Sequence, residues 1–397
     1  MSKVFVTAYG SISAIGNNVE ESLNSLIEKR HGVAPIHILD TIHKDEFVLA
    51  EVKYTNDELA QILGIDNTKE TYTRTSLLAM IASREAYKQA KLDQHSELRT
   101  GVVSANTGGG MDITERYYKA VVSEQIVDFA STHSCGDSTE KIAEFLRIKG
   151  FTSTISTACS SSANAIIYGA RLIKHGRLDR VIVGGVDSMS KFTLNGFNTL
   201  MILDRQHCQP WDENRRGLNL GEGAGYLVLE SEKAQKISQN KILAELSGYA
   251  NANDAYHQTA SSPEGKGATL AMKNAIASAN LTPSDISYIN VHGTGTTNND
   301  QSEGTALGNI FDQVPPFSTT KAYTGHTLGA AGGIEAIFSI LAINNNLVFP
   351  CLNIDTPIKE FSFKPETKLR TDVKIKHVLS NSFGFGGNNT TLIFSEH

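Results

Sequence analysis

The sequence predicts a layered α/β protein. Short runs rich in β-branched residues alternate with longer segments whose apolar residues recur at helical spacing, and the alternation continues through most of the chain. At 397 residues the chain exceeds the size at which a single hydrophobic core stops growing, so we expect two domains or two fused halves. Hydrophobic residues make up 40% and charged residues 20% of the chain, which is typical of a globular protein.

The first half alternates predicted strands with predicted helices. The predicted strands are residues 4–7, 100–104, 153–157 and 180–184, and the predicted helices are residues 19–27, 114–122 and 160–174. The first strand is predicted to run into a glycine turn. The helix at 160–174 is predicted to stop at the pair His175-Gly176.

A polar, lysine-rich stretch at 230–241 is the predicted seam between the two halves. We therefore expect an N-terminal half at residues 1–240 and a C-terminal half at residues 241–397. After the seam the alternation resumes, with predicted strands at 242–249 and 288–291 and predicted helices at 267–280 and 333–344. No repeat is visible in the sequence, so any duplication of the halves would be structural.

Composition argues against several classes of function. The net charge of −6 disfavours nonspecific binding of nucleic acid. The first residues resemble a buried strand rather than a secretory signal, and the most apolar later segment, 334–341, is too short to cross a bilayer. Four cysteines without regular spacing predict neither a disulfide framework nor a metal site. We expect a soluble protein of the reducing cytoplasm.

Cys159 is the most informative single residue. It lies in a run of small and hydroxyl residues, 156–165, at the start of a predicted helix. Such a turn exposes a thiol, aims backbone N–H groups at it and lets the helix dipole favour the thiolate, as a nucleophile requires. The alternative is that Cys159 fills core space, which is our interpretation of the remaining cysteines, Cys135, Cys208 and Cys351.

Two later histidine motifs favour the nucleophile. They are His292-Gly293-Thr294-Gly295-Thr296 and Lys321-Ala322-Tyr323-Thr324-Gly325-His326. A thiolate can take an acyl group from a thioester, and two neutral imidazoles can donate hydrogen bonds to the thioester oxygen of a second substrate as it becomes an enolate. Stabilising that enolate makes decarboxylation of a malonyl unit possible. Either histidine alone would more simply be a hydrogen-bonded structural residue, but the three motifs together predict chemistry.

Three further residues complete the predicted site. Lys321 can act electrostatically on it, and Glu335 can serve as the counter-charge of Lys321. Glycines on both sides of Phe385 allow a turn in which a backbone N–H faces the thiol and the aromatic ring blocks or opens an acyl tunnel. The alternative for this segment is a plain tight turn with two core phenylalanines, Phe383 and Phe385.

On these motifs the chain resembles a β-ketoacyl-acyl-carrier-protein synthase of the elongating class, within the thiolase-like superfamily. The resemblance runs from residues 3–7 almost to the C-terminus. It implies a five-layered αβαβα sandwich of two similar halves, usually a homodimer, with a heterodimer of related subunits as the alternative. The implied reaction is a decarboxylative Claisen condensation of a cysteine-bound acyl group with malonyl-acyl-carrier protein. The resemblance implies no bound cofactor, because the substrates are carried on the 4′-phosphopantetheine of the acyl carrier protein.

The resemblance also implies a role for each site residue. Cys159, His292 and His326 form a triad that Lys321 and Glu335 support. The N–H groups of Cys159 and Phe385 form an oxyanion hole, and Phe385 is the gate. The phosphopantetheine arm and the substrate are bordered by Thr294, Thr296, Phe197, Phe383 and Gly108, while Asp254, His257, Asp300 and Glu303 match positions with structural or ion-organising roles.

Two departures from the family pattern leave the pathway open. Gly108 stands where relatives often carry a bulky aliphatic residue near the far end of the acyl pocket, which predicts a roomier pocket. Met201 stands where a basic residue often helps to bind the carrier protein. For that contact we consider Lys69, Arg74 and Arg205.

Four alternatives to a housekeeping elongation enzyme follow. The first is a ketosynthase of a dedicated polyene or polyketide pathway. The second is a noncatalytic chain-length-determining partner subunit, although such subunits typically lack the nucleophile that this chain retains. A degradative thiolase is disfavoured because the C-terminal glycine-rich segment has phenylalanines in place of a second cysteine. An initiating synthase is disfavoured because His326 is a second histidine.

Overall fold

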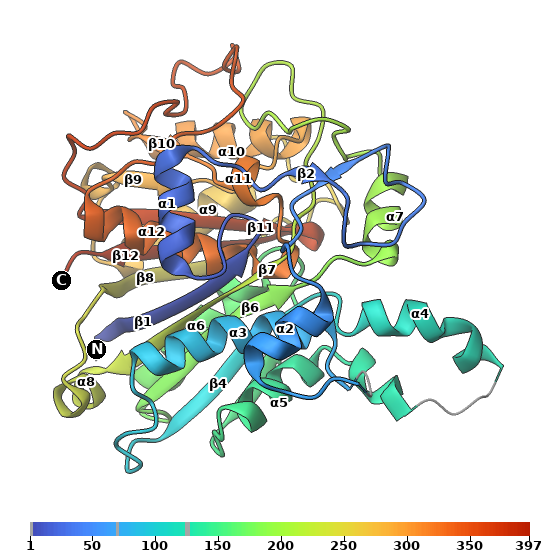
Figure 1. The fold of residues 1–397 in the computed structure, drawn as a ribbon. Coiled ribbons are helices and arrows are strands. Elements are labelled where there is room, and N and C mark those ends of the chain that lie inside the picture. Colours follow the sequence, from blue (N-terminus) through green and yellow to red (C-terminus); the bar gives the residue numbers. More distant parts are fainter. Residues whose placement is uncertain (1–2, 69–70, 124–127) are drawn as a thin grey trace.

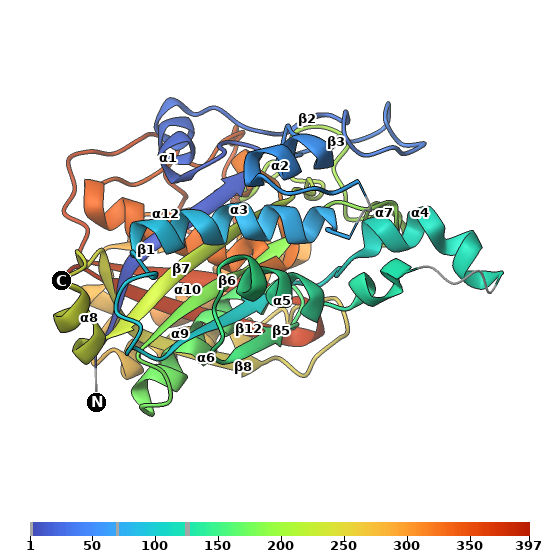
Figure 2. The ribbon, with the colours of Figure 1, turned by 60° about the horizontal axis from the view of Figure 1, so that its bottom comes forward.

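In the computed structural model of the protein, which describes residues 3–68, 71–123 and 128–397, helices and sheet strands form five alternating layers (Figures 1 and 2). Helices α6 and α12 contact strands from both halves of the sheet, so they form the central layer. Helices α3 and α5 cover the outer face of one half of the sheet, and α9 and α10 lie outside the other half. The layered α/β fold expected from the sequence is confirmed.

In the described residues, ten strands form the main sheet in the order β10-β9-β11-β12-β8-β1-β7-β6-β4-β5. A separate pair, β2 and β3, lies apart from it. The strands are β1 Val4–Ser13, β2 Ala34–Pro35, β3 Val48–Leu49, β4 Thr100–Ala105, β5 Thr152–Ile155, β6 Arg180–Asp187, β7 Gly223–Ser231, β8 Ala244–Asn253, β9 Tyr288–Asn290, β10 Phe317–Ser318, β11 His377–Gly384 and β12 Asn388–Ser395.

The strand order repeats across the junction between β1 and β8. From that junction outward one side reads β1, β7, β6, β4, β5 and the other reads β8, β12, β11, β9, β10. Each series therefore places its first strand innermost and its third strand at the edge. Two residue pairs, Phe5 with Glu245 and Val6 with Ala244, join β1 to β8 in antiparallel register.

Helices connect the strands within each of the two series. They are α1 Val19–Glu28, α2 Asn56–Leu63, α3 Arg74–Gln89, α4 Met111–Val122, α5 Gly136–Phe145, α6 Ser161–Lys174, α7 Lys191–Thr199, α8 Glu232–Ser238, α9 Lys266–Ser278, α10 Thr297–Ile310, α11 Lys321–Thr324 and α12 Ala331–Asn345, with short 3₁₀ turns at Asp128–His133, Pro283–Asp285, Leu328–Ala330 and Phe385–Gly387. The predicted boundary between the halves, residues 230–241, contains the end of β7 and all of α8.

The glycine turn predicted after residue 7 is wrong. Strand β1 continues through Gly10 to Ser13. A Cβ on Gly10 would lie 2.1 Å from the carbonyl oxygen of Ala82, so glycine is required here because α3 approaches the strand backbone closely. The glycine marks a close approach between two layers rather than a turn.

Helix α12 is apolar around most of its circumference and is longer than the predicted segment. The stretch Leu328–Asn345, which includes it, has the length and composition of a membrane span, the one such stretch among the described residues. Of that stretch, 89% is buried inside the protein. A helix that is hydrophobic on all sides is expected at the centre of a large layered fold, and α12 occupies that central layer.

Candidate active site

Cys159 lies in a tight turn between β5 and α6. Ala158 adopts left-handed φ of 54°, an uncommon conformation for a residue with a side chain, and α6 begins two residues after Cys159. The turn is fixed by hydrogen bonds in which the Thr157 N–H donates to the Ser161 hydroxyl at 2.8 Å and that hydroxyl donates to the Ala158 carbonyl at 2.6 Å. The thiol is therefore held at the start of the helix, as predicted.

The ionisation of this thiol differs from the prediction. Burial raises the pKa of Cys159 to about 12 and outweighs the nearby Lys321 cation, which lowers it. The backbone N–H groups of Phe385 and of Cys159 itself hydrogen-bond the sulfur and also lower its pKa. The expectation of a thiolate in the free protein is thus wrong, because Cys159 is only 6% exposed. The cation and the N–H groups stabilise negative charge as it develops at the sulfur.

His292 follows β9 and is fixed through its main chain. The Glu303 carboxylate accepts hydrogen bonds from the N–H groups of His292 and Gly293, both at 2.9 Å. The Nζ of Lys321 donates to the His292 carbonyl at 2.6 Å. Burial of Glu303 raises its pKa to about 7, although these donors oppose the rise.

His326 follows α11 and is fixed on both its main chain and its ring. Its N–H donates to the Asn219 carbonyl at 2.7 Å. Its ring Nδ1 accepts a hydrogen bond from the Leu328 N–H at 3.3 Å. An Nδ1 that accepts cannot carry the proton of a neutral imidazole, so that proton is assigned to Nε2.

The two imidazoles lie edge to face. Their ring centroids are 5.3 Å apart and their planes meet at 84°. Burial and the Lys321 cation lower the pKa of both rings well below 6.5. Both histidines are therefore neutral hydrogen-bond donors near pH 7.

Lys321 and Glu335 form a buried ion pair behind the histidines. Lys321 is 1% exposed and its Nζ donates to Glu335 Oε1 as well as to the His292 carbonyl. Burial raises the pKa of Glu335, and the Lys321 charge opposes this rise. The pair places one cation beside the thiol and the rings, since Lys321 lowers the pKa of all three groups.

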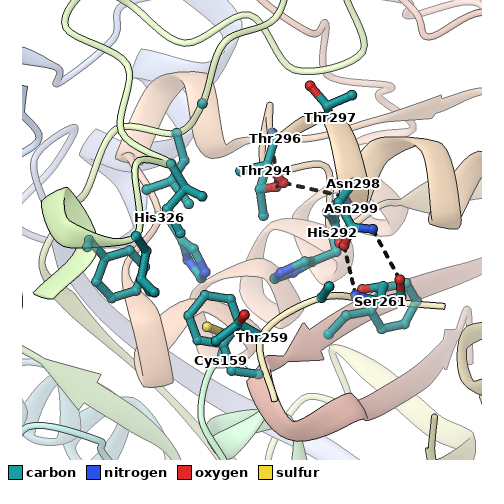
Figure 3. Close-up of a pocket in the computed structure, with 18 of the residues that line it drawn as sticks. Cys159, Thr259, Ser261, His292, Thr294, Thr296, Thr297, Asn298, Asn299 and His326 are labelled. Atoms are coloured by element: carbon teal, nitrogen blue, oxygen red, sulfur yellow. Dashed lines mark hydrogen bonds between the residues drawn. The ribbon is translucent and has the colours of Figure 1, made fainter. Parts of the chain in front are cut away.

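One cavity of about 310 Å³ collects most of the predicted residues (Figure 3). Cys159, His292 and His326 point into it from the turn before α6, from the loop after β9 and from the loop after α11. The other predicted residues that line it are Thr294, Thr296, Phe197, Phe383 and Phe385. Three segments distant in the sequence therefore meet in the same chamber.

The mouth of the cavity is bordered by α7, the start of α10 and the loop that contains Ser261. Phe385 stacks on Phe197 with ring centroids 5.8 Å apart. The Asn298 side chain accepts from the Ser261 N–H at 2.7 Å and donates to the Ser261 carbonyl at 3.1 Å, as the dashed lines in Figure 3 show. This pair of bonds joins the loop to the first turn of α10.

Three of the predicted residues that the structure describes lie away from this cavity. Gly108 does not line the cavity and follows β4 in a loop that Asp187 holds, so its contribution to an acyl pocket stays a prediction. Arg74 is wrong as a surface contact because it is 5% exposed and its guanidinium bonds the Glu222 carboxylate. Arg205 is exposed and pairs with Glu46, whereas Lys69 falls outside the described residues.

Sequence reasoning missed two polar residues that organise the site. Asp187, at the end of β6, binds the loops after β4 and after His326. Asn298 fixes the loop at the mouth. Asp187 could have been identified from the sequence, because it is a carboxylate directly after a predicted buried, valine-rich strand. No sequence pattern distinguishes Asn298. Within residues 3–68, 71–123 and 128–397 no cluster of three or more His, Cys, Asp or Glu side chains is arranged to hold a metal ion.

Family comparison matches most of the chain. Residues 1–235 match the family described as "Beta-ketoacyl synthase, N-terminal domain", and residues 243–355 match "Beta-ketoacyl synthase, C-terminal domain". A relative named 3-oxoacyl-[acyl-carrier-protein] synthase 2 from Staphylococcus aureus (strain COL) is 33% identical, over 99% of this chain and 98% of the relative. A protein of the same name from Coxiella burnetii is 32% identical over the same shares.

Solved structures with the same fold include two ketosynthase complexes. "The ishigamide ketosynthase/chain length factor" has a TM-score of 0.93 and 28% identity, covering 100% of this chain and 99% of that one. The ketosynthase ApeO in complex with its chain length factor ApeC from Xenorhabdus doucetiae has a TM-score of 0.86 and 30% identity, covering 100% of this chain and 98% of that one.

Proposed function

The chain belongs to the β-ketoacyl synthase family, and we propose that Cys159, His292 and His326 carry out its decarboxylative Claisen condensation. The observation that supports these roles is the single cavity into which all three side chains point, with the Lys321 cation beside them. The enzyme is a condensing acyltransferase of the thiolase-like superfamily.

In the first half-reaction the sulfur of Cys159 attacks the carbonyl carbon of an acyl thioester. The carrier thiol leaves and the acyl group becomes attached to Cys159. The thiol proton must leave the Cys159 sulfur during this step, because burial keeps the free thiol protonated. The departing carrier thiolate takes up one proton, so the step balances. The N–H groups of Cys159 and Phe385 are placed to donate hydrogen bonds to the oxyanion of the tetrahedral intermediate, since both already hydrogen-bond the Cys159 sulfur.

In the second half-reaction the two neutral imidazoles bind the thioester oxygen of the malonyl unit. The bond between the malonyl Cα and its carboxylate breaks, CO₂ leaves and the electron pair forms an enolate whose oxygen the imidazoles stabilise. The enolate carbon then attacks the acyl carbon on Cys159 and the carbon–sulfur bond breaks. The Cys159 thiolate that leaves takes up a proton from solvent and regenerates the thiol. His326 donates its Nε2–H, because its Nδ1 accepts from the Leu328 N–H and the ring proton is therefore on Nε2.

The substrate arm and the partner belong to the same proposal. Thr294 and Thr296, whose hydroxyls bond each other at 2.9 Å, line the cavity and are placed to contact the phosphopantetheine arm of an acyl carrier protein. Arg205, whose side chain is 70% exposed, is the remaining described candidate for the carrier contact. Phe197, Phe383 and Phe385 border the acyl group, and Phe385 gates it.

A second candidate pathway is a dedicated polyene or polyketide synthesis. The similarity to the structure named "The ishigamide ketosynthase/chain length factor" supports it, because the match covers the full chain with a TM-score of 0.93. A chain-length-determining subunit is less well supported, because the complete Cys-His-His set is retained. Assembly with a second copy or with a related subunit is proposed on the same similarity, since two of the solved neighbours contain a chain length factor.

The halves and the compartment are proposed on structural grounds. The repeated strand order supports an N-terminal half at residues 1–240 and a C-terminal half at residues 241–397, with Cys159 in the first and both histidines in the second. All four cysteines of the chain are free, which supports the reducing cytoplasm as its place of action.

Mass spectrometry of the intact protein after incubation with a panel of acyl-carrier-protein thioesters tests the proposal. An acyl mass on Cys159 is expected, with the preferred chain distinguishing straight fatty acyl groups from conjugated polyene groups. Cys159→Ala provides the matched control and should gain no mass. If the isolated protein stays unlabelled and a partner subunit becomes labelled instead, the chain-length role replaces the catalytic one.

A further inference from the structure

Asp187 is a buried carboxylate that joins three segments next to the cavity. It ends β6 and is 1% exposed. Its Oδ1 accepts from the Thr107 N–H at 2.9 Å and the Gly108 N–H at 3.1 Å. Its Oδ2 accepts from the Thr107 hydroxyl and from the Gly329 N–H, both at 2.7 Å. The side chain thus links the loop after β4 to the segment that follows His326.

The bond to Gly329 matters because of the preceding residue. Leu328 donates the N–H that His326 Nδ1 accepts, and it adopts a left-handed φ of 53°. That conformation is costly for a residue with a branched side chain and persists only where its surroundings hold it. The Gly329 N–H belongs to the next peptide of the same turn, so the Asp187 carboxylate holds the turn from one side while His326 contacts the other.

Building on the proposed condensation, we propose that Asp187 is a positioning residue for His326. Through Gly329 it holds the strained turn whose Leu328 N–H keeps the Nδ1 of His326 an acceptor. The proton therefore stays on Nε2, the ring edge left for the malonyl oxygen in the cavity that His326 lines.

The geometry requires a carboxylate rather than an amide at this position. In all of these hydrogen bonds the Asp187 carboxylate is the acceptor, and both of its oxygens are occupied. An asparagine would turn its NH₂ group toward the Gly329 N–H or toward the N–H groups of Thr107 and Gly108. One of the two loops would then lose its acceptor.

The Asp187 charge also affects Cys159, and this effect opposes catalysis because it disfavours the thiolate. The negative charge raises the pKa of the thiol. Removing the charge should therefore weaken the His326 position while making Cys159 easier to ionise. A general loss of structure would also expose the thiol and speed its alkylation, because burial is the main cause of its raised pKa. The pair of effects therefore identifies a positioning role when the circular dichroism spectrum of the variant matches that of wild type.

The test compares Asp187→Asn with wild type in two assays. The first measures CO₂ release from malonyl-CoA, and the second measures alkylation of Cys159 by iodoacetamide between pH 6 and 10 by intact mass. We expect CO₂ release to fall about 10- to 100-fold, because small misplacements of a reacting group cost that much. We expect Cys159 to be alkylated faster than in wild type at each pH of this range, because its pKa lies above the range and loss of the Asp187 charge lowers it.

A second variant separates position from charge. A Cβ on Gly329 would lie 2.7 Å from Asp187 Oδ2, so Gly329→Ala disturbs this contact while keeping the carboxylate. It should lose CO₂ release without a shift in the alkylation profile. Asp179→Asn is the matched control, because Asp179 is 4% exposed, accepts three N–H bonds from Arg99 and precedes the opposite end of β6. It should change neither readout.

Two results would overturn the role of Asp187. One is CO₂ release at the wild-type rate in both Asp187→Asn and Gly329→Ala. The other is an equal loss in Asp179→Asn. A wild-type protein that released no CO₂ would overturn the proposed function and this role with it, whereas an active wild type with unimpaired variants would overturn the role alone.

Discussion

Phe385 stacks on Phe197 at the mouth of the cavity that contains Cys159, with ring planes 20° apart. The backbone N–H of Phe385 also bonds the Cys159 sulfur. Phe385 therefore contacts Cys159 through its main chain, while its ring lies at the mouth of the cavity. Under the proposed gating role, movement of the Phe385 ring opens this route to the thiol.

Phe197→Ala should increase the access of reagents to Cys159. An aromatic pair contributes about 0.5 to 1.5 kcal/mol, so its loss should raise the population of the open gate about 2- to 10-fold. The measurement is the rate of Cys159 alkylation by iodoacetamide at a fixed pH. Phe192→Ala is the matched control, because Phe192 is on the same helix, is 65% exposed and does not line the cavity. Equal alkylation rates in wild type and Phe197→Ala would show that the stack does not restrain the gate.

Asn298→Ala should release the loop at the mouth. The asparagine makes two hydrogen bonds to the Ser261 main chain, each contributing about 1 kcal/mol. Hydrogen exchange at the Ser261 amide should therefore become several-fold faster, and KM for the carrier-bound substrate should rise more than kcat falls. Asn309→Ala removes a comparable side chain from the far end of the same helix and should leave the exchange of Ser261 unchanged. Unchanged Ser261 protection in Asn298→Ala would contradict this.

His292 and His326 should stay neutral as the pH falls from 8 to 6. Burial and Lys321 lower both pKa values well below 6.5, so these rings should not titrate in that range, whereas an unperturbed imidazole does. The measurement is a ¹⁵N-histidine NMR titration, with the two signals assigned from His292→Ala and His326→Ala. Chemical shifts of either ring that follow a pKa near 6.5 would contradict the burial.

The same depressed pKa values set the sign of a stability effect. Below pH 6.5 the unfolded chain takes up protons at these two imidazoles that the native site does not accept, so the free energy of unfolding should fall as the pH drops below 6.5. Urea unfolding at pH 7.5 and 5.5 measures this change. The change should be smaller in His326→Ala than in wild type.

The two half-reactions should separate in the histidine variants. His292→Ala and His326→Ala each remove one donor to the enolate oxygen, at a cost of about 3 kcal/mol, or roughly 100-fold in decarboxylation. Acylation of Cys159 should remain largely intact, because the proposed oxyanion hole for that step is made by the main-chain N–H groups of Cys159 and Phe385. CO₂ release and acyl labelling are measured on the same preparations, and equal losses in both would refute the division of labour.

Much of the site was predictable because its chemistry lies in short motifs. Cys159, His292 and His326 each stand among small residues, and the fold brings them to one cavity as expected. The layered α/β fold was predictable from the alternation of strand and helix patterns. Both predictions depend on local sequence.

The remaining properties depend on tertiary packing. Arg74 was misassigned to the surface because nothing local shows that Glu222, far along the chain, buries it. The raised pKa of Cys159 depends on how completely the fold covers the thiol. Gly10 was misassigned to a turn because its need for glycine comes from α3, which packs against it. No local pattern encodes these contacts.

The most direct test of the proposed chemistry is the rate at which Cys159→Ala forms 3-oxoacyl product from an acyl-carrier-protein thioester and malonyl-acyl-carrier protein. Without the sulfur there is no acyl-enzyme, so product formation should fall to the background rate while the protein keeps its fold by circular dichroism. Product formation by Cys159→Ala at the wild-type rate would contradict a covalent mechanism at this residue.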